Sequence, residues 1–241
     1  MTELVYMSAP GQAEIEANVL SVEEGENGVA LILDRTPFYP QGGGQPSDTG
    51  TIEGDGFTFI VNKAVLVDGV VHHQGVVAAG ESVPGPVSAR IDAEPRALHA
   101  ALHSGGHLIM TAMSELTGMR AVKGFHFPQG AYVEFEGTLD EATKAELVEA
   151  LQRRIDEMIE ADEEVHVEST TVGELLAEGV FMPAEVPTDK PTRVVTTCGY
   201  RSPCGGTHVA RTGELTGLRV RRVKSKSGRT RVAYEFATEG E

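Results

Sequence analysis

Two short motifs about a hundred residues apart constrain the fold of this chain more than any other feature. His103-Ser-Gly-Gly-His107 and Cys204-Gly-Gly-Thr-His208 each hold two potential metal ligands four positions apart. This spacing puts both side chains on one face of a helix or across one tight turn. Imidazole and thiolate are the donors that Zn²⁺ prefers, and two such pairs fill a tetrahedral shell. We therefore predict one zinc site shared by both motifs, rather than separate core histidines and a buried thiol.

The length and the cysteine content of the chain suit an enzyme of one or two domains. The chain has 241 residues, of which 40% are hydrophobic, so a sizeable core is expected. Its first residues lack the pattern of a signal peptide, and no apolar run is long enough to cross a membrane. In a reducing compartment, Cys204 is better explained as a ligand than as half of a disulfide with Cys198. We expect a cytoplasmic protein with no membrane partner.

The net charge of −16 argues against a nucleic-acid binder, but the charge is unevenly distributed. Residues 201–241 hold nine arginines and lysines and four glutamates, a balance of +5, which leaves −21 for the first 200 residues. A basic stretch on an acidic chain suggests a local phosphate-binding surface, although a solvated β-hairpin also explains it. The candidate phosphate-binding residues are Arg219, Arg221, Arg222, Lys224, Lys226, Arg229 and Arg231. Strand alternation predicts that only about half of them share one face.

The first part of the chain is predicted to form a small β-barrel. Apolar or alternating runs at 19–22, 29–33, 57–61 and 65–77 are separated by Gly, Asn and Asp. The Pro- and Gly-rich segment 80–86 marks the expected boundary. We therefore assign residues 1–88 to a β-barrel-like domain and residues 89–241 to a zinc-binding α+β domain.

The second domain is predicted to combine helices with strands. One helix is expected over residues 93–116 and carries the first histidine motif. Another is expected over residues 139–161, where Thr138 and Glu141 form a capping-box pattern. Strands are expected at 131–136, 194–197 and 218–236. This order of elements indicates an α+β fold.

A third motif is the glycine-rich segment Thr36-Pro-Phe-Tyr-Pro-Gln-Gly-Gly-Gly-Gln-Pro-Ser-Asp-Thr-Gly50. Three consecutive glycines permit positive φ and close approach of the backbone to a ligand. The flanking Phe38, Tyr39 and Pro40 argue against a mobile hairpin loop. The segment lacks Gly-x-Gly-x-x-Gly spacing and a following Lys-Ser/Thr, so it is not a nucleotide-binding loop.

The three motifs together resemble the signatures of the editing domain of alanyl-tRNA synthetase, and in particular of its free-standing relatives, the AlaX proteins. The resemblance rests on residues 38–50, 103–108 and 204–209, and the glycine-rich motif is similar to that of the medium-length AlaX class. It implies a trans-editing hydrolase that deacylates Ser-tRNA(Ala), with Gly-tRNA(Ala) as a further candidate substrate. It also implies an editing-domain fold of the type shared by alanyl- and threonyl-tRNA synthetases. Because the chain has no room for an aminoacylation domain, we expect editing without charging.

The resemblance assigns roles to individual residues. His103, His107, Cys204 and His208 correspond to metal positions. Thr36 corresponds to a position associated with sensing the serine hydroxyl, and Thr36, Gly43 and Gln45 are the expected catalytic residues. His99, one turn before His103, is expected to be a polar residue of the core or its rim.

The chemistry of an aminoacyl ester is compatible with this function. The ester is already activated, so the enzyme mainly has to place a water and stabilise an oxyanion. Zinc could activate that water or bind the substrate amino group, but four protein ligands leave no open position, so three-ligand and four-ligand states both stay open. Two other functions fit the motifs: a zinc-stabilised binding module without catalysis, and a zinc hydrolase of a small ester or amide. The glycine-rich segment favours an enzyme, and the basic strands favour tRNA.

Overall fold

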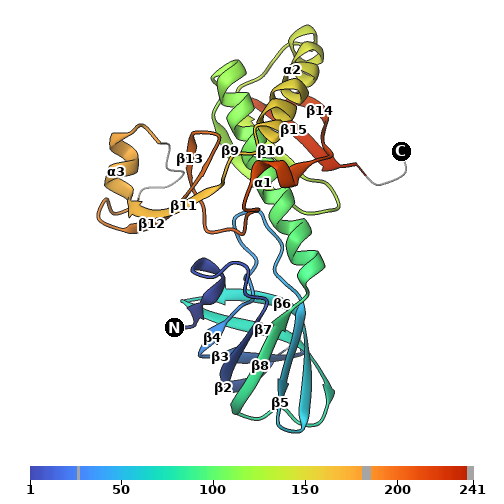
Figure 1. Cartoon of the computed structure of the whole chain (residues 1–241), viewed down its shortest axis with the longest axis vertical. Coiled ribbons are helices and arrows are strands. Elements are labelled where there is room, and N and C mark those ends of the chain that lie inside the picture. The colour runs from blue at the N-terminus through green and yellow to red at the C-terminus, as the bar shows by residue number, and fades with distance from the viewer. Residues whose placement is uncertain (26–27, 181–185, 238–241) are drawn as a thin grey trace. The chain divides into compact units, whose positions relative to one another are not determined.

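The computed structural model describes residues 1–25, 28–180 and 186–237 (Figure 1). Contacts between residues divide the chain into two compact units, Met1–His99 and Ala100–Glu241. The prediction of a mixed α+β chain with a small β-barrel is confirmed. The assignment of residues 1–88 and 89–241 to separate domains stays a prediction, because contacts alone do not measure independent folding. Within the described residues, no helix combines the length and the apolar character that a membrane span requires.

The first unit is a closed barrel of six antiparallel strands in the order β2-β3-β7-β6-β5-β8 (Figure 1). The strands are β2 (Glu14–Gly25), β3 (Gly28–Leu33), β5 (Gly50–Gly54), β6 (Phe57–Val67), β7 (Val70–Ala79) and β8 (Gly85–Ile91). A short parallel pair, β1 (Glu3–Leu4) and β4 (Arg35–Thr36), and the 3₁₀ turn η1 (Val5–Met7) complete the unit. Closure leaves no unpaired sheet edge and encloses a core that includes Leu31, Phe38, Ile52 and Phe59.

Two parts of this barrel differ from the predicted strands. The run expected at 65–77 is two strands, because Asp68, at φ 48°, and Gly69 form the tight turn between β6 and β7. The strands β5 and β8 were not predicted. Both are short and rich in Gly, Ser or Pro, which weakens an apolar pattern, yet they close the barrel by pairing with each other.

The second unit is built on a four-stranded antiparallel sheet in the order β14-β15-β10-β9. The strands are β9 (Ala121–Phe125), β10 (Tyr132–Glu136), β14 (Leu218–Lys226) and β15 (Arg229–Phe236). Helices α1 (Ala93–Thr117) and α2 (Glu141–Glu160) lie beside this sheet (Figure 1). Their apolar side chains pack against one face of it. Core residues include Ile109, Met113, Leu151, Phe135 and Val232. The other face of the sheet carries the polar residues that alternate with these.

The predicted cap of the second helix is wrong. Helix α2 begins after Asp140, whose carboxylate accepts a hydrogen bond of 2.8 Å from the Thr143 backbone N–H. Thr138 lies two residues too early to cap this helix, although Thr-x-x-Glu matches the capping-box pattern. An aspartate with extended φ and ψ directly before the first turn satisfies the exposed N–H groups instead.

A smaller antiparallel sheet, in the order β11-β12-β13, accompanies the second unit. Its strands are β11 (His166–Thr171), β12 (Pro191–Thr197) and β13 (Tyr200–Pro203). The short helix α3 (Val172–Ala177), which was not predicted, follows β11 and begins with a capping box of Thr171 and Glu174. The 3₁₀ turn η2 (Thr212–Leu215) precedes β14. The cysteine motif follows this sheet directly, because β13 ends at Pro203 and Cys204 is the next residue.

Candidate metal centre

The structure brings the two predicted ligand pairs together. The ligand atoms of His103, His107, Cys204 and His208 all lie within 4.8 Å of one another, and this group could hold a metal ion. The Cys204 Sγ atom lies 3.4 Å from His103 Nε2 and 3.3 Å from His208 Nε2. His103 and His107 come from neighbouring turns of α1, whereas Cys204 and His208 come from the loop after β13.

The donor atoms fit a metal ion in both spacing and hydrogen bonding. Tetrahedral zinc with Zn–S of ~2.3 Å and Zn–N of ~2.0–2.1 Å separates neighbouring ligand atoms by roughly 3.5 Å. The two S···N distances of 3.4 and 3.3 Å are close to that separation. In addition, His107 Nδ1 is buried and has no hydrogen-bond partner within the described part of the chain. A buried ring nitrogen without a partner is costly, unless a ligand other than protein reaches it.

Burial sets the protonation of the ligand side chains. Desolvation lowers the pKa of His107 to about 4 and lowers those of His103 and His208 well below the usual value, which keeps the imidazoles neutral. A neutral imidazole is the form that ligates a metal. Desolvation also raises the pKa of the Cys204 thiol, and the nearby Arg193 guanidinium opposes that rise.

Arg193, on β12, holds the loop that carries the cysteine. Its Nη1 atom donates to the backbone carbonyls of Cys204, at 2.7 Å, and Gly206, at 3.0 Å. The carbonyl of Arg193 in turn accepts the Cys204 backbone N–H at 3.1 Å. One residue therefore fixes both ends of the Cys-Gly-Gly segment.

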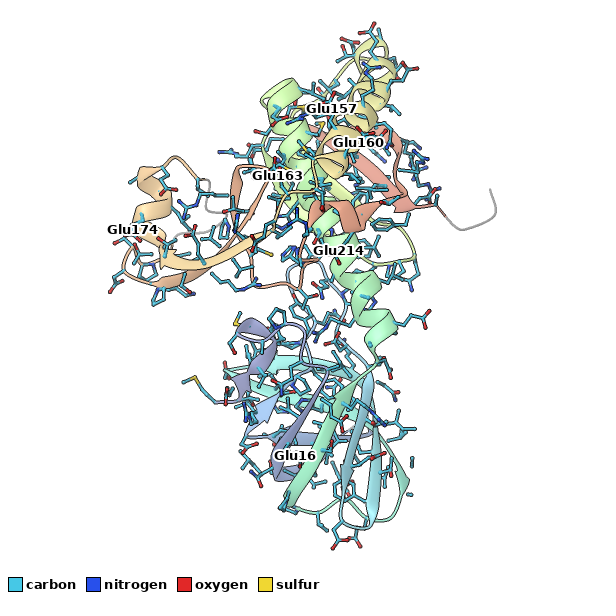
Figure 2. All side chains as sticks on the ribbon, viewed as in Figure 1. Glu16, Glu157, Glu160, Glu163, Glu174 and Glu214 are labelled. Atoms are coloured by element: carbon cyan, nitrogen blue, oxygen red, sulfur yellow. The ribbon has the colours of Figure 1, made fainter. Side chains whose placement is uncertain are left out.

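Ser104 connects the two motifs on the other side of the centre. Its hydroxyl oxygen accepts the Val209 backbone N–H at 3.1 Å and lies 3.1 Å from His208 Nδ1. A hydrogen bond at Nδ1 orients the ring so that Nε2 faces Cys204. The backbone after the motif is fixed as well, because Glu214, labelled in Figure 2, accepts the N–H groups of Ala210 and Arg211. These two hydrogen bonds measure 2.9 and 2.8 Å.

His126 is a buried residue beside the ligands that sequence reasoning missed. Its ring stacks on that of His103, with centroids 4.5 Å apart. The Tyr234 hydroxyl donates to the Leu102 carbonyl at 2.9 Å, so its oxygen accepts from His126 Nδ1 at 2.5 Å. Burial lowers the pKa of His126 to about 3, which keeps this ring neutral. A single histidine between two strands gives no periodic signal in the sequence.

The glycines of the first motif make room for this packing. A Cβ atom at Gly106 would lie 2.4 Å from His126 Cε1 and 2.9 Å from the Tyr234 hydroxyl. At Gly105, by contrast, the nearest atoms to an added Cβ atom would be the end of the Leu218 side chain, at 3.0 Å, and the Tyr234 ring, at 3.6 Å. Gly106 is therefore required by the close approach of His126 and Tyr234. The two glycines inside a helix were the sequence signal that could have indicated this packing.

The first unit holds the glycine-rich segment and its three predicted catalytic residues. Gly43 and Gly44 have φ of 53° and 80° and form a two-residue turn, closed by hydrogen bonds between Gly42 and Gln45. Gln45 is buried. The tight turn accounts for Gly43 and Gly44, and catalysis by Gly43 and Gln45 stays a prediction.

Thr36 is buried inside the first unit. The ring of His73 bonds the Leu31 carbonyl through Nδ1 at 2.9 Å, so its Nε2 atom accepts the Thr36 hydroxyl at 2.7 Å. The Thr36 oxygen also accepts the Phe38 backbone N–H at 3.2 Å. His99, the other histidine singled out in the sequence, is half-buried, and burial lowers its pKa.

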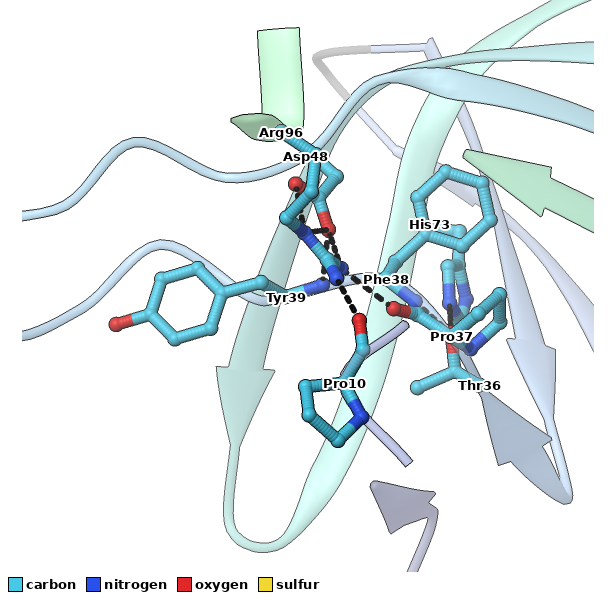
Figure 3. Close-up of polar contacts among 8 residues, drawn as sticks. All are labelled: Pro10, Thr36, Pro37, Phe38, Tyr39, Asp48, His73 and Arg96. Atoms are coloured by element: carbon cyan, nitrogen blue, oxygen red, sulfur yellow. Dashed lines mark hydrogen bonds and ion pairs between the residues drawn. The ribbon is translucent and has the colours of Figure 1, made fainter. Parts of the chain in front are cut away.

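A buried ion pair ties the glycine-rich segment to the first turn of α1 (Figure 3). Arg96 Nε lies 2.9 Å from Asp48 Oδ1 and 3.0 Å from Oδ2, and Nη2 also bonds this carboxylate. Nη2 donates to the Pro37 carbonyl at 2.7 Å, and Asp48 accepts the Tyr39 N–H at 2.6 Å. Since both charges are satisfied on several sides, the segment is held in one conformation.

The seven basic residues of β14 and β15 are all exposed on one face of the sheet. Val220 pairs with Tyr234 and Arg222 pairs with Ala233, so Arg221 is the extra residue of a β-bulge. The prediction that only about half share a face is wrong, because the bulge shifts the alternation by one residue. Arg222 therefore points to the same side as Arg219.

Three of these cations are paired with carboxylates on the same face. Arg221 bonds Glu235 at 3.1 Å, Arg229 bonds Glu136 at 3.3 Å, and Arg231 bonds Glu134 at 2.8 Å. Within the described residues, the remaining four have no ion pair: Arg219, Arg222, Lys224 and Lys226. All four lie on strand β14.

Comparison with known proteins connects this chain with alanine–tRNA ligases. Residues 5–95 match the family described as tRNA synthetases class II (A). Over 98% of its length, the chain is 29% identical to the alanine–tRNA ligase of Pseudomonas entomophila. It is 32% identical over 91% of its length to that of Halobacterium salinarum, and 33% identical over 92% to that of Methanothrix thermoacetophila. The chain spans only 24–29% of the length of these relatives.

Proposed function

We propose that this chain is a trans-editing hydrolase that deacylates Ser-tRNA(Ala), with Gly-tRNA(Ala) as a second substrate. The observation that carries the proposal is the His/Cys group, in a chain similar over almost all of its length to alanine–tRNA ligases. For the second unit we propose the editing-domain type shared by alanyl- and threonyl-tRNA synthetases. The proposed partner is tRNA(Ala) carrying the wrong amino acid, in the cytoplasm.

Zinc is the metal that we assign to this centre. Three imidazoles and one thiolate suit Zn²⁺ better than the oxygen-seeking Mg²⁺ or Ca²⁺. When bound, zinc would supply a Lewis acid for the ester or for the attacking water. The chain's own residues keep the ligands in position: Arg193 fixes the Cys204 backbone, and Ser104 orients the His208 ring.

The reaction itself is the hydrolysis of an activated ester. Water adds to the carbonyl carbon, and the tetrahedral oxyanion collapses to free serine and the ribose hydroxyl of the tRNA. Positioning of the water and stabilisation of the oxyanion contribute most of the acceleration. Serine differs from alanine by one hydroxyl, so a group that hydrogen-bonds this hydroxyl rejects alanine strongly. Thr36, Gly43 and Gln45 are the residues that we propose for catalysis and for this selection.

A zinc-stabilised tRNA-binding module without catalysis is the second candidate. Four protein ligands are typical of closed structural sites, in which zinc contributes folding energy. The Thr36 hydroxyl, already bonded to His73 and Phe38, also suits a structural role. Both candidates require the same metal centre, so only a measurement of hydrolysis distinguishes them.

Release of serine from Ser-tRNA(Ala) by the purified chain tests the proposal. We expect the wild type and Cys198→Ala, which changes the cysteine outside the metal group, to release serine. Cys204→Ala should lose this activity, since it removes the thiolate ligand. A wild-type protein that binds tRNA but releases no serine would favour the binding module.

A further inference from the structure

The basic face of the sheet contains a hollow of about 660 Å³ between β10, β15 and β14. Across its floor, Tyr132, Ala233 and Arg222 lie side by side, because Tyr132 pairs with Ala233 and Ala233 pairs with Arg222. Neighbouring strands are ~4.8 Å apart. A small methyl group therefore separates an aromatic ring from a guanidinium group two strands away.

The side chains around this floor suit a planar, negatively charged ligand. Arg222, Lys224 and Lys226 line the hollow and have no ion pair within the described residues. The Tyr132 ring already holds one planar group, since Arg231 Cζ lies 4.0 Å from the ring centroid and Glu134 fixes that guanidinium. Phe125 stacks on Tyr132 as well, with centroids 5.2 Å apart, so the ring is held in place from its own sheet.

We propose that this hollow binds an unpaired nucleotide of RNA, with the base above Ala233 between the Arg231 guanidinium that covers Tyr132 and the Arg222 guanidinium. Lys224 and Lys226 then contact the flanking phosphates. Paired bases are hidden within a helix, so a duplex would contact the cations and would have no base to place above Ala233. Unpaired bases, in contrast, stack on aromatic rings and guanidinium planes. This inference rests on the proposed tRNA function and identifies the part of the RNA that the basic face holds.

Uncharged RNA tests the inference without measuring hydrolysis. The probes are a short single-stranded oligoribonucleotide and a blunt-ended hairpin of similar charge, closed by a non-nucleotide linker so that it holds no unpaired base. Ala233→Leu fills the floor and changes no charge, so it should weaken single-strand binding roughly ten-fold or more, as loss of one stacked base does. Hairpin binding and the salt dependence of the single strand should stay unchanged. Circular dichroism and the melting temperature check that the variant is folded.

Two further variants separate stacking from charge. Arg222→Gln should weaken single-strand binding more than Arg219→Gln, an unpaired arginine on the same strand that does not line the hollow. Because the chain has no tryptophan, Tyr132→Trp places a single reporter in the hollow, and its fluorescence should be quenched by the single strand only.

Three results would overturn the inference: unchanged single-strand affinity in Ala233→Leu, equal effects of the two arginine variants, or equal quenching by the hairpin. Any of these would identify the hollow as an ordinary part of a basic surface. If binding follows the expected pattern but serine is not released from Ser-tRNA(Ala), the proposed hydrolase fails while the RNA site stands.

Discussion

At the scale of single residues, burial determines what the metal centre can do. His103, His107 and His208 lose their charge in the interior, and Cys204 is surrounded by these rings and by Arg193. Neutral nitrogens and a sulfur at these distances have few protein groups to bond. A metal cation bound by all four atoms therefore offsets the unfavourable loss of solvation at each of them.

The first prediction concerns metal content. Purified wild-type protein should contain one zinc ion per chain, and His103→Ala and Cys204→Ala should lose most of it, because each removes a ligand. Cys198→Ala is the matched control and should retain full zinc, since Cys198 lies outside the ligand group. Elemental analysis decides the question, and full zinc in both ligand variants would disprove the assignment.

A second prediction concerns His73 and the stability of the first unit. Burial lowers the pKa of His73 to about 4, below its unfolded value of ~6.5, so the unfolded chain takes up the proton first. The contribution of His73 to the free energy of unfolding is fully present above about pH 6.5 and is lost as the pH falls toward 4. At pH 5 the loss should reach about 2 kcal/mol.

The measurement is urea unfolding at pH 7.5 and pH 5 for the wild type and for His73→Gln, which removes the titrating group. The wild type should lose about 2 kcal/mol more than the variant over this interval. Other histidines contribute to both proteins and cancel in the difference. Equal losses would show that His73 does not titrate in this way.

At the scale of elements, helix α1 contains two glycines although glycine is unfavourable inside a helix, and at Gly106 close packing explains the exception. Glycine inside a helix costs roughly 0.5–1 kcal/mol relative to alanine. Gly105→Ala should therefore be close to neutral in stability, since its new methyl group meets the flexible end of Leu218. Gly106→Ala should destabilise the protein by about 1–3 kcal/mol and reduce zinc affinity, because the methyl group displaces His126 and Tyr234.

Thermal unfolding and zinc titration of these two variants provide the comparison. The pair is matched, because both glycines lie in the same turn and receive the same substitution. Equal stability and equal zinc affinity in the two variants would contradict the proposed role of the His126 packing.

The bulge in β14 changes the prediction for RNA binding at this scale. An unpaired cation that contacts a phosphate releases about one counterion on binding, so its loss should lower the salt slope by about one unit. Arg219→Ala and Lys226→Ala should behave in this way. Arg229→Ala and Arg231→Ala should change the slope less, because carboxylates already compensate these two arginines. The test is tRNA affinity measured at several salt concentrations. Identical salt slopes in all four variants would contradict the predicted difference between unpaired and paired cations.

Sequence reasoning succeeded where a local pattern carries the information. The spacing of His103 and His107 requires only a helix, and the alternation in the N-terminal strands requires only a half-buried sheet. It failed where the cause is non-local or where several residues compete. Asp140 replaces Thr138 as the cap, Arg221 shifts the alternation of β14, and His126 is placed by contacts with residues far away in sequence. The consecutive glycines at 42–44 predicted positive φ correctly at two positions, but not the turn that they form.

At the scale of the whole molecule, two units with separate cores contribute different features. The barrel carries the glycine-rich segment, fixed by Asp48 and Arg96, and matches a class II tRNA synthetase family. The second unit carries the metal group and the basic sheet face. The similarity to alanine–tRNA ligases extends across both. We propose that a chain with these features removes serine from tRNA(Ala).

The most direct measurement is the initial rate of deacylation of Ser-tRNA(Ala) and of Ala-tRNA(Ala) at the same concentration of zinc-loaded protein. We predict rapid release of serine and little release of alanine, because a site that hydrogen-bonds the serine hydroxyl leaves a polar group unpaired when alanine is bound. The selectivity should persist when the tRNA concentration is varied, since it arises in the amino-acid site. Equal rates on the two substrates would contradict selective editing, and no release from either would contradict the proposed hydrolase.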